Sequence, residues 1–299
     1  MNYRKLQKTD LEISEISFGC MSLDLSGKNN EKILQNAFDQ GINYFDTADL
    51  YDKGANEELV GKTLRPIRNQ VIIATKVGNE WLPDGSTWRW NASKSYISQA
   101  VDKSLKRLQT DYIDIYQLHG GTMEDNHEEI IEAFEELKTL GKIRHYGLSS
   151  IRPNVIKSLS EQSNMVSDML QYSLLDRRPE ENVLNVLHSN NVGVMARGAL
   201  AKGLLADKPA KSYLNHSEEQ VNHLQNSLKQ LSNEHRNQAQ TAVKFVLQHP
   251  SVTTAVVGFR TLEQLQGIIN LSSCPDLSKE EMQLLSDSSV AHQYDQHRI

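Results

Sequence analysis

The chain has 299 residues and a formal net charge of −6, with 38% hydrophobic and 23% charged residues. This composition excludes a disordered or collagen-like chain. A pI near 5.9 argues against a protein whose main function is to bind nucleic acid or an anionic membrane. Two cysteines, Cys20 and Cys274, fit neither a disulfide framework nor a zinc pattern. With no apolar signal segment and no membrane-length apolar run, we expect a cytoplasmic protein.

Strand-like runs of β-branched and aromatic residues alternate with helix-period segments along the whole chain. The predicted strands are Ile16–Cys20, Asn43–Asp46, Val71–Lys76, Ile113–His119, Ile143–Ser149, Asp168–Gln171, Val192–Arg197 and Thr254–Gly258. The predicted helices are Asn30–Gln40, Asn56–Leu64, Lys94–Leu108, Glu128–Leu140, Pro153–Leu159, Pro179–Asn190, His235–Gln248 and Leu262–Asn270. No linker separates these strand–helix units, and no G-x-G-x-x-G turn follows the first strand. The pattern therefore predicts a single α/β domain that spans residues 1–299. It favours a (β/α)8 TIM barrel and disfavours a doubly wound sheet.

Three segments lie outside these units. Residues 1–15 can be interpreted as a short hairpin that closes the barrel floor. Ala201–Glu234 is polar, has a weak helical period over Glu218–Leu231, and is expected to run over one barrel mouth. A third segment, the loop after the third strand, carries three tryptophans that either line a substrate pocket or pack on the surface: Trp81, Trp88 and Trp90.

Polar residues end successive predicted strands, at the barrel end where enzymes of this fold place their reactive groups. Asp46, Lys76 and His119 end three strands, and Tyr51 follows Asp46 in a loop. A buried Lys76 needs a partner, and Asp46 is the natural one. The Lys76 ammonium is expected to lower the pKa of Tyr51 from about 10 toward neutrality, which would make Tyr51 a proton donor. Taken singly, these residues also fit a structural ion pair and a core histidine.

These four residues, in this order, resemble the aldo-keto reductase family. Similarity continues through Gly54-Ala-Asn-Glu57 with Gly61, and through segments 132–144, 246–250 and 256–260, so that it covers roughly residues 3–272. The resemblance implies reversible reduction of an aldehyde or ketone by hydride from a nicotinamide cofactor, without a metal. It makes Tyr51 the general acid, Lys76 the group that lowers its pKa, Asp46 the partner of Lys76, and His119 the group that orients the carbonyl oxygen.

The resemblance also implies a cofactor site, with some departures from the family's pattern. Ser149 matches the serine of the family's Ser-Asn pair, which holds the nicotinamide carboxamide, but Ser150 replaces the asparagine. Arg197 stands where many members place an aromatic residue against the nicotinamide ring. Gly267-Ile268 replaces a Glu-Asn pair near the adenine. A bidentate Arg260 near a 2′-phosphate would favour NADPH over NADH. The implied cofactor residues are Gly19, Met21, Ser149, Gln171, Arg197, Gly198, Leu200, Gly203, Gly258, Phe259, Arg260 and Gln264.

Two other functions stay open on the sequence. A barrel of this family can act as a redox-sensing or regulatory subunit that binds nicotinamide with little turnover. An isomerase or aldolase would instead use Lys76 as a Schiff-base amine. The leading hypothesis is an NADPH-dependent reductase of a small carbonyl substrate, with a monomer as the simplest oligomeric state and no nucleic acid or membrane as partner.

Overall fold

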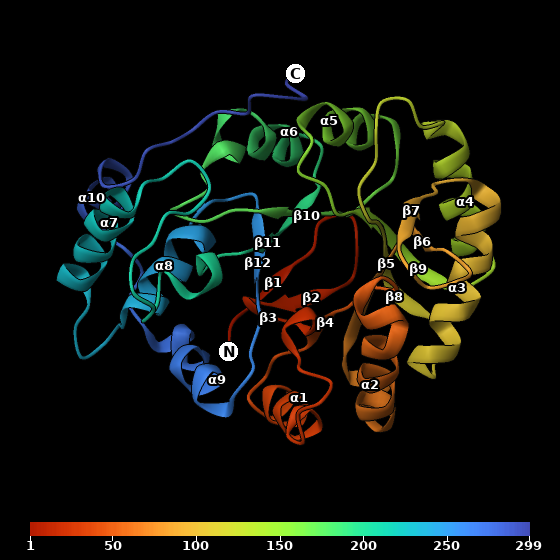
Figure 1. Ribbon diagram of the computed structural model, residues 1–299, viewed down its shortest axis with the longest axis horizontal. Helices are drawn as coiled ribbons and strands as arrows, with labels where there is room; N and C mark the ends of the chain where they lie inside the picture. The colour runs from red at the N-terminus through yellow and green to blue at the C-terminus, as the bar shows by residue number, and fades with distance from the viewer.

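Eight parallel strands pair edge to edge into a closed barrel in the computed structural model, which describes residues 1–299 (Figure 1). Around the barrel the strands follow chain order, and β12 pairs with β3 to close it. The barrel strands are β3 (Ile16–Gly19), β4 (Tyr44–Asp46), β5 (Ile72–Val77), β8 (Ile113–Leu118), β9 (Ile143–Leu148), β10 (Ser167–Gln171), β11 (Gly193–Arg197) and β12 (Val252–Val257). The predicted (β/α)8 architecture is confirmed.

Helices surround the barrel and bury one apolar stripe each against it. In α1, for example, Ile33, Leu34 and Ala37 recur at helical spacing and are buried. The covering helices are α1 (Asn30–Asp39), α2 (Ala55–Leu64), α3 (Lys94–Leu108), α4 (His127–Thr139), α5 (Pro153–Gln162), α6 (Val183–Ser189), α8 (Gln238–Leu247) and α9 (Leu262–Ile269). None of the helices is long and apolar enough to span a lipid bilayer.

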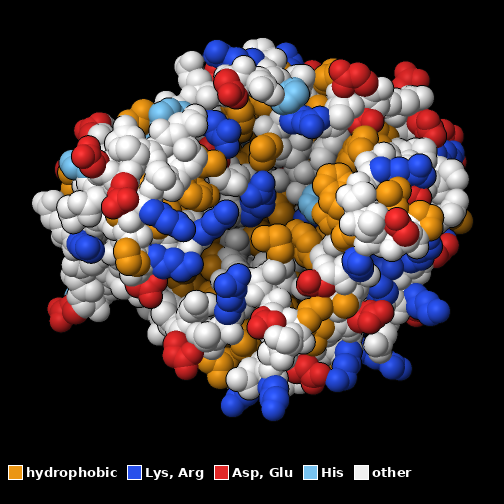
Figure 2. Space-filling view, in the orientation of Figure 1, with side chains coloured by type: hydrophobic (Ala, Val, Ile, Leu, Met, Phe, Trp, Pro, Cys, Tyr) orange, Lys and Arg blue, Asp and Glu red, His pale blue; other side chains and the backbone are white.

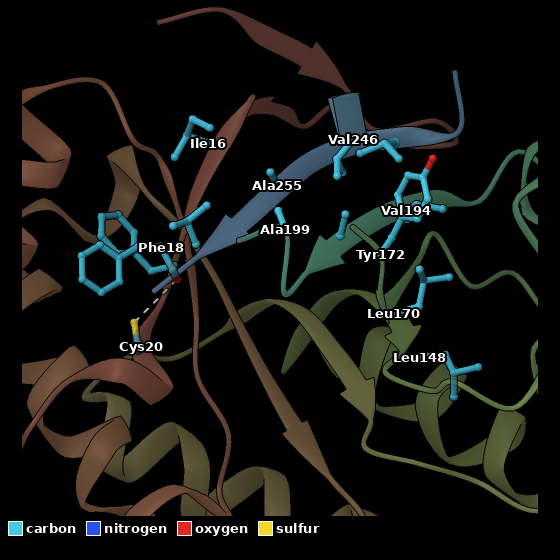
Figure 3. Close-up of a cluster of buried hydrophobic side chains, with 14 of the residues drawn as sticks. Ile16, Phe18, Cys20, Leu148, Leu170, Tyr172, Val194, Ala199, Val246 and Ala255 are labelled. Atoms are coloured by element: carbon cyan, nitrogen blue, oxygen red, sulfur yellow. Dashed lines mark hydrogen bonds between the residues drawn. The ribbon is translucent and has the colours of Figure 1, made fainter. Parts of the chain in front are cut away.

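The hydrophobic core forms two layers, as the alternation of side chains along each strand requires. The larger cluster joins outward-facing strand residues to the helices, and Figure 3 shows part of it, with Phe18 from β3, Leu170 from β10 and Val194 from β11. A smaller cluster joins inward-facing strand residues such as Ile115 and Met195. The barrel interior is therefore filled with side chains and provides a rigid base for the residues at its mouth.

The hairpin interpretation of residues 1–15 is confirmed. β1 (Tyr3–Lys5) pairs antiparallel with β2 (Glu12–Ser14). Leu6 and Ile13 are fully buried and belong to the interior cluster. Arg4 fastens the hairpin to the barrel, because its guanidinium donates to the carbonyl oxygens of Leu247 at 2.6 Å and Val252 at 2.9 Å.

Two predicted helices have different boundaries. The helix expected over Pro179–Asn190 is divided into a 3-10 turn, η4 (Arg178–Glu181), and α6, because Asn182 has the non-helical angles φ −161° and ψ −29°. The helix expected from His235 begins at Gln238. There Asn237 and Gln240 cap it reciprocally, each side chain accepting a hydrogen bond from the other's backbone N–H.

The remaining elements are insertions in the repeating pattern. Helix α7 covers Glu218–Leu231, as the weak period indicated, and α10 (Lys279–Asp287) was not predicted. Neither was the small hairpin of β6 (Asn79–Trp81) and β7 (Trp88–Trp90), which follows β5. Short 3-10 turns also follow the barrel strands or helices: η1 (Cys20–Ser22), η2 (Tyr51–Gly54), η3 (Arg65–Gln70), η5 (Ala201–Gly203) and η6 (Asn270–Ser273).

Candidate active site

A buried ion pair lies at the mouth of the barrel, between the neighbouring strands β4 and β5. The Lys76 Nζ atom donates to both Oδ atoms of Asp46 and to the Thr47 carbonyl oxygen, each at 2.7 Å. Lys76 is fully buried and Asp46 nearly so. Burial works to lower the pKa of Lys76, but Asp46 and Tyr51 outweigh it and raise that pKa. Lys76 is therefore a fixed ammonium ion, paired with Asp46 as predicted.

Tyr51 lies beside this ammonium. Its 3-10 turn, η2, follows the loop after β4, and the Tyr51 hydroxyl is 3.4 Å from Lys76 Nζ. The ammonium also lies 5.1 Å from the centre of the tyrosine ring. The expected pKa shift of Tyr51 is wrong in direction: burial raises the pKa, and the opposing charge of Lys76 does not reverse it. At neutral pH Tyr51 is a protonated phenol held next to a cation.

His119 completes the predicted group of four. It directly follows β8, where its backbone N–H donates to the Val77 carbonyl oxygen at 2.7 Å. The edge of its ring meets the ring of Tyr51, with centroids 6.0 Å apart. Burial first, and then the charges of Lys76 and Arg197, lower the pKa of His119 to about 3. The imidazole is therefore neutral at physiological pH and offers one N–H donor.

Buried polar residues behind the site hold its loops in place, and none of them was assigned an individual role from the sequence. Thr47 donates to Asn56 Oδ1 at 2.7 Å, and Asn56 donates to the Cys20 carbonyl oxygen at 2.9 Å. Thr75, on β5 beside Lys76, donates to Glu57 Oε1 at 2.6 Å. Asn56 and Glu57 belong to the Gly54–Glu57 motif and are buried at the start of α2. Their hydrogen bonds behind the site explain why the motif needs these two polar residues.

The β6–β7 hairpin packs at the edge of the mouth. The Trp90 ring lies where a Cβ on Gly78 or Gly120 would be, and its Nε1 donates to Asp125 Oδ1 at 2.9 Å. The Lys53 ammonium lies 5.3 Å from the ring centre of Trp81. Trp90 is therefore a packing residue, whereas Trp81 stands next to the turn that carries Tyr51.

Two residues of the expected nicotinamide site, Gln171 and Arg197, lie on adjacent strands. Gln171 and Arg197 end β10 and β11 in register, and the Arg197 guanidinium donates to Gln171 Oε1 at 2.9 Å. Gln171 Nε2 in turn donates to the Tyr213 hydroxyl at 3.3 Å, a neighbour that the sequence did not reveal. Ser149 follows β9, and its N–H donates to the Leu118 carbonyl oxygen at 2.8 Å.

The glycines of the expected cofactor site lie where side chains would not fit. A Cβ on Gly258 would lie only 2.7 Å from Ser22 Cβ, and Ser22 Oγ joins the loops after β3 and β12 by donating to the Gly19 and Phe259 carbonyl oxygens. Gly198, which follows β11, has a φ of +74°, a conformation that favours glycine. Gly258 therefore lets the loops after β3 and β12 pack closely, and Gly198 lets the chain turn directly after β11.

Of the other expected cofactor residues, Phe259 is buried in the core against Phe18, with ring centroids 5.3 Å apart, whereas the rest are at or near the surface. Met21 is 68% exposed. Arg260 is exposed, and its backbone N–H donates to Gln264 Oε1 at 2.8 Å. Leu200 is half-buried between Gly198 and Gly203 on the loop after β11. The structure thus brings all twelve candidates to the C-terminal ends of β3 and β9–β12, next to the arc of β4, β5 and β8 that holds the four reactive residues.

Figure 2 shows this mouth as a hollow near the middle of the molecule, with Lys and Arg side chains along one side and hydrophobic side chains along the other. A phenol, an ammonium and a neutral imidazole together can hold a carbonyl oxygen and give it a proton. The barrel and this group of residues are typical of oxidoreductases that act on carbonyl compounds. Consistent with that, residues 15–289 match the model of the aldo/keto reductase family. The chain belongs to this family, and it is an oxidoreductase that acts on carbonyl compounds.

Individual relatives match all or most of the chain. The chain is 45% identical to the uncharacterized oxidoreductase YqkF of Bacillus subtilis, covering 100% of both chains. It is 31% identical to the aldo-keto reductase YhdN of the same organism, over 91% of this chain and 89% of that one. Among solved structures, the holo form of aldo-keto reductase AKR11C1 from Bacillus halodurans superposes with a TM-score of 0.95 at 45% identity, covering both chains completely. The apo form of that protein gives a TM-score of 0.85.

Proposed function

We propose that the protein reduces aldehydes or ketones to alcohols with NADPH, and that Tyr51 is the proton donor. The observation that carries the proposal is the Tyr51 hydroxyl 3.4 Å from an ammonium that Asp46 holds in place, with the neutral His119 against the same tyrosine ring. The agreement with the holo form of a relative supports a cofactor-bound working state.

The residues on the rim fit a nicotinamide dinucleotide. Gly198 has a left-handed backbone in the loop proposed for the phosphate groups, and Gln171 presents an amide at the end of β10, beside Arg197. Ser149 and Gln171 would hold the carboxamide, the loop Gly198–Gly203 the pyrophosphate, and Arg260 the adenosine end. When bound, the cofactor supplies the hydride.

The chain's own residues supply the rest of the chemistry. As hydride reaches the carbonyl carbon, negative charge grows on the oxygen, and Tyr51 gives that oxygen its phenolic proton. The Lys76 ammonium stabilises the phenolate that remains, and Asp46 keeps Lys76 in position. His119 donates a hydrogen bond that orients the oxygen. Because its pKa is raised, Tyr51 stays protonated until negative charge develops on the carbonyl oxygen.

The geometry disfavours a Schiff-base enzyme. A nucleophilic lysine needs an uncharged amine and thus a lowered pKa. Lys76 instead donates to three oxygen atoms at 2.7 Å, and its pKa is raised.

The test is a comparison of native protein with Tyr51→Phe, which removes the hydroxyl and keeps the ring. We expect NADPH oxidation by a reactive aromatic aldehyde to fall by about 10²- to 10⁴-fold in the variant, while NADPH binding persists. Tyr3→Phe, in the floor hairpin, is the control and should keep full turnover. Native protein that binds NADPH but turns over no aldehyde or ketone would instead establish the sensor function.

Cofactor preference is tested on the same assay. Native protein should show a higher kcat/KM with NADPH than with NADH, because a 2′-phosphate gains a bidentate partner in Arg260. Arg260→Gln should narrow that difference by raising KM for NADPH alone. Equal efficiency of the native protein with both cofactors would refute the preference.

A further inference from the structure

Arg197 is a positive charge without a negative partner at the mouth of the barrel. Its hydrogen bond goes to the neutral amide of Gln171, at 2.9 Å from Oε1. A guanidinium stays charged at any pH the protein meets. The other cation of the chamber, Lys76, is matched by Asp46 at 2.7 Å. No carboxylate lies within ion-pair distance of Arg197, although the buried Asp46 and Asp168 both sense its charge.

This charge acts on the reactive residues themselves. It contributes to lowering the pKa of His119, after burial and Lys76, and it also works to lower the pKa of Tyr51. Arg197 therefore lies close enough to both side chains for its field to be felt. If Tyr51 and His119 hold the carbonyl oxygen, the carbonyl carbon lies beside them at the barrel mouth. The nicotinamide ring that donates hydride to this carbon must then lie there too. On the proposed function, that ring lies within the field of Arg197.

We propose that Arg197 makes the protein discriminate between the two redox states of its cofactor, binding NADPH more tightly than NADP⁺. The inference rests on the proposed function. The oxidised nicotinamide ring is a cation and the reduced ring is neutral, whereas the phosphates and the adenosine are the same in both. A fixed guanidinium near the ring repels only the oxidised form, and Arg260 at the far end contributes equally to both.

The consequence is a preference for the reductive direction. Weak binding of NADP⁺ speeds its release after each turnover and limits its inhibition when both forms are present. Because the reduced form is favoured on the protein, the potential of the bound couple shifts upward, by about 30 mV for each tenfold difference in affinity, so the reductive bias comes from the faster release of NADP⁺ and not from a stronger hydride donor. A charge pair a few ångströms apart in a partly hydrated site supports a difference of about tenfold.

The test measures binding rather than turnover. Dissociation constants for NADPH and NADP⁺ are determined by quenching of tryptophan fluorescence for native protein, Arg197→Gln and Arg197→Lys. Lys211→Gln is the control, because it removes an exposed cation outside the expected site. We expect the ratio of the NADP⁺ to the NADPH constant to be about ten in native protein and in the Lys211 variant, to approach one in Arg197→Gln, and to stay mostly intact in Arg197→Lys.

The outcomes separate this inference from the proposed function. A native ratio near one, or a ratio that Arg197→Gln leaves unchanged, overturns the role of Arg197 even if the protein reduces aldehydes efficiently. Absence of NADPH binding to native protein overturns both. The same ratio measured with NADH and NAD⁺ should again depend on Arg197, since the 2′-phosphate plays no part in it.

Discussion

His119 is kept neutral by its surroundings, and this has a consequence for stability. Burial and two nearby cations lower its pKa to about 3, against 6.5 for an exposed histidine. Between these two values the unfolded chain binds a proton that the folded chain does not bind. The contribution of His119 to stability is therefore fully present above pH 6.5 and is lost progressively as the pH falls toward 3.

We predict that the native protein loses about 2 kcal/mol of unfolding free energy between pH 7 and pH 5 through His119 alone. His119→Gln removes the titrating group and should show a pH dependence smaller by that amount. Urea denaturation of both proteins at the two pH values measures the difference. Parallel pH dependences would mean that His119 binds its proton equally in the folded and unfolded chains, and the lowered pKa would then be wrong.

At the scale of elements, α2, α3 and β5 meet behind the site through a buried carboxylate. Glu57 of α2 is fully buried, accepts from Thr75 of β5, and pairs with Arg107 Nε of α3 at 2.6 Å. Asp49, in the loop before Tyr51, lies near the same group: burial and the charge of Glu57 raise its pKa, and Arg107 opposes them. One guanidinium thus pairs with Glu57 and offsets only part of the effect that burial and Glu57 have on Asp49.

Arg107→Met should destabilise the protein by about 3–5 kcal/mol, because it leaves the Glu57 carboxylate buried without a partner. Adding Glu57→Gln should recover part of that loss, since the uncompensated charge is gone. Lys62→Met is the matched control, because it breaks the exposed Lys62–Glu31 pair and should cost less than about 1 kcal/mol. Equal losses for Arg107→Met and Lys62→Met in urea denaturation would contradict the importance of burial here.

How far the elements were predictable depended on the length of their patterns. The eight barrel strands and most helices followed from repeated hydrophobic periods, and the floor hairpin from its position. The β6–β7 hairpin did not, because its two short strands combine tryptophan with charged residues, are mostly not buried and form no apolar run. The break at Asn182 was also hidden, since a backbone angle set by tertiary packing leaves no periodic signal.

The residues of the candidate site could be predicted where they end or closely follow a predicted strand, but their contacts across loops could not. Asp46, Lys76, Tyr51 and His119 followed from strand ends, which carry site residues in a barrel. The Tyr213 contact to Gln171 was not visible, because it joins residues on different loops. The pKa direction of Tyr51 was wrong because proximity to Lys76 can be inferred from sequence, whereas the degree of burial cannot.

At the scale of the whole molecule, the two ends of the barrel have different tasks. The reactive residues lie at the C-terminal ends of the strands, and the hairpin of β1 and β2 closes the opposite end.

Ile13→Ala opens a cavity in the buried floor and should cost about 2–5 kcal/mol of unfolding free energy. Its kcat/KM for the test aldehyde should stay native below the unfolding transition, because the packed interior separates Ile13 from Tyr51. Leu140→Ala, which truncates a side chain that is 68% exposed, should change neither quantity. A fall in kcat/KM of the folded Ile13 variant, measured with stability at the same temperature, would show that the floor controls the geometry of the mouth.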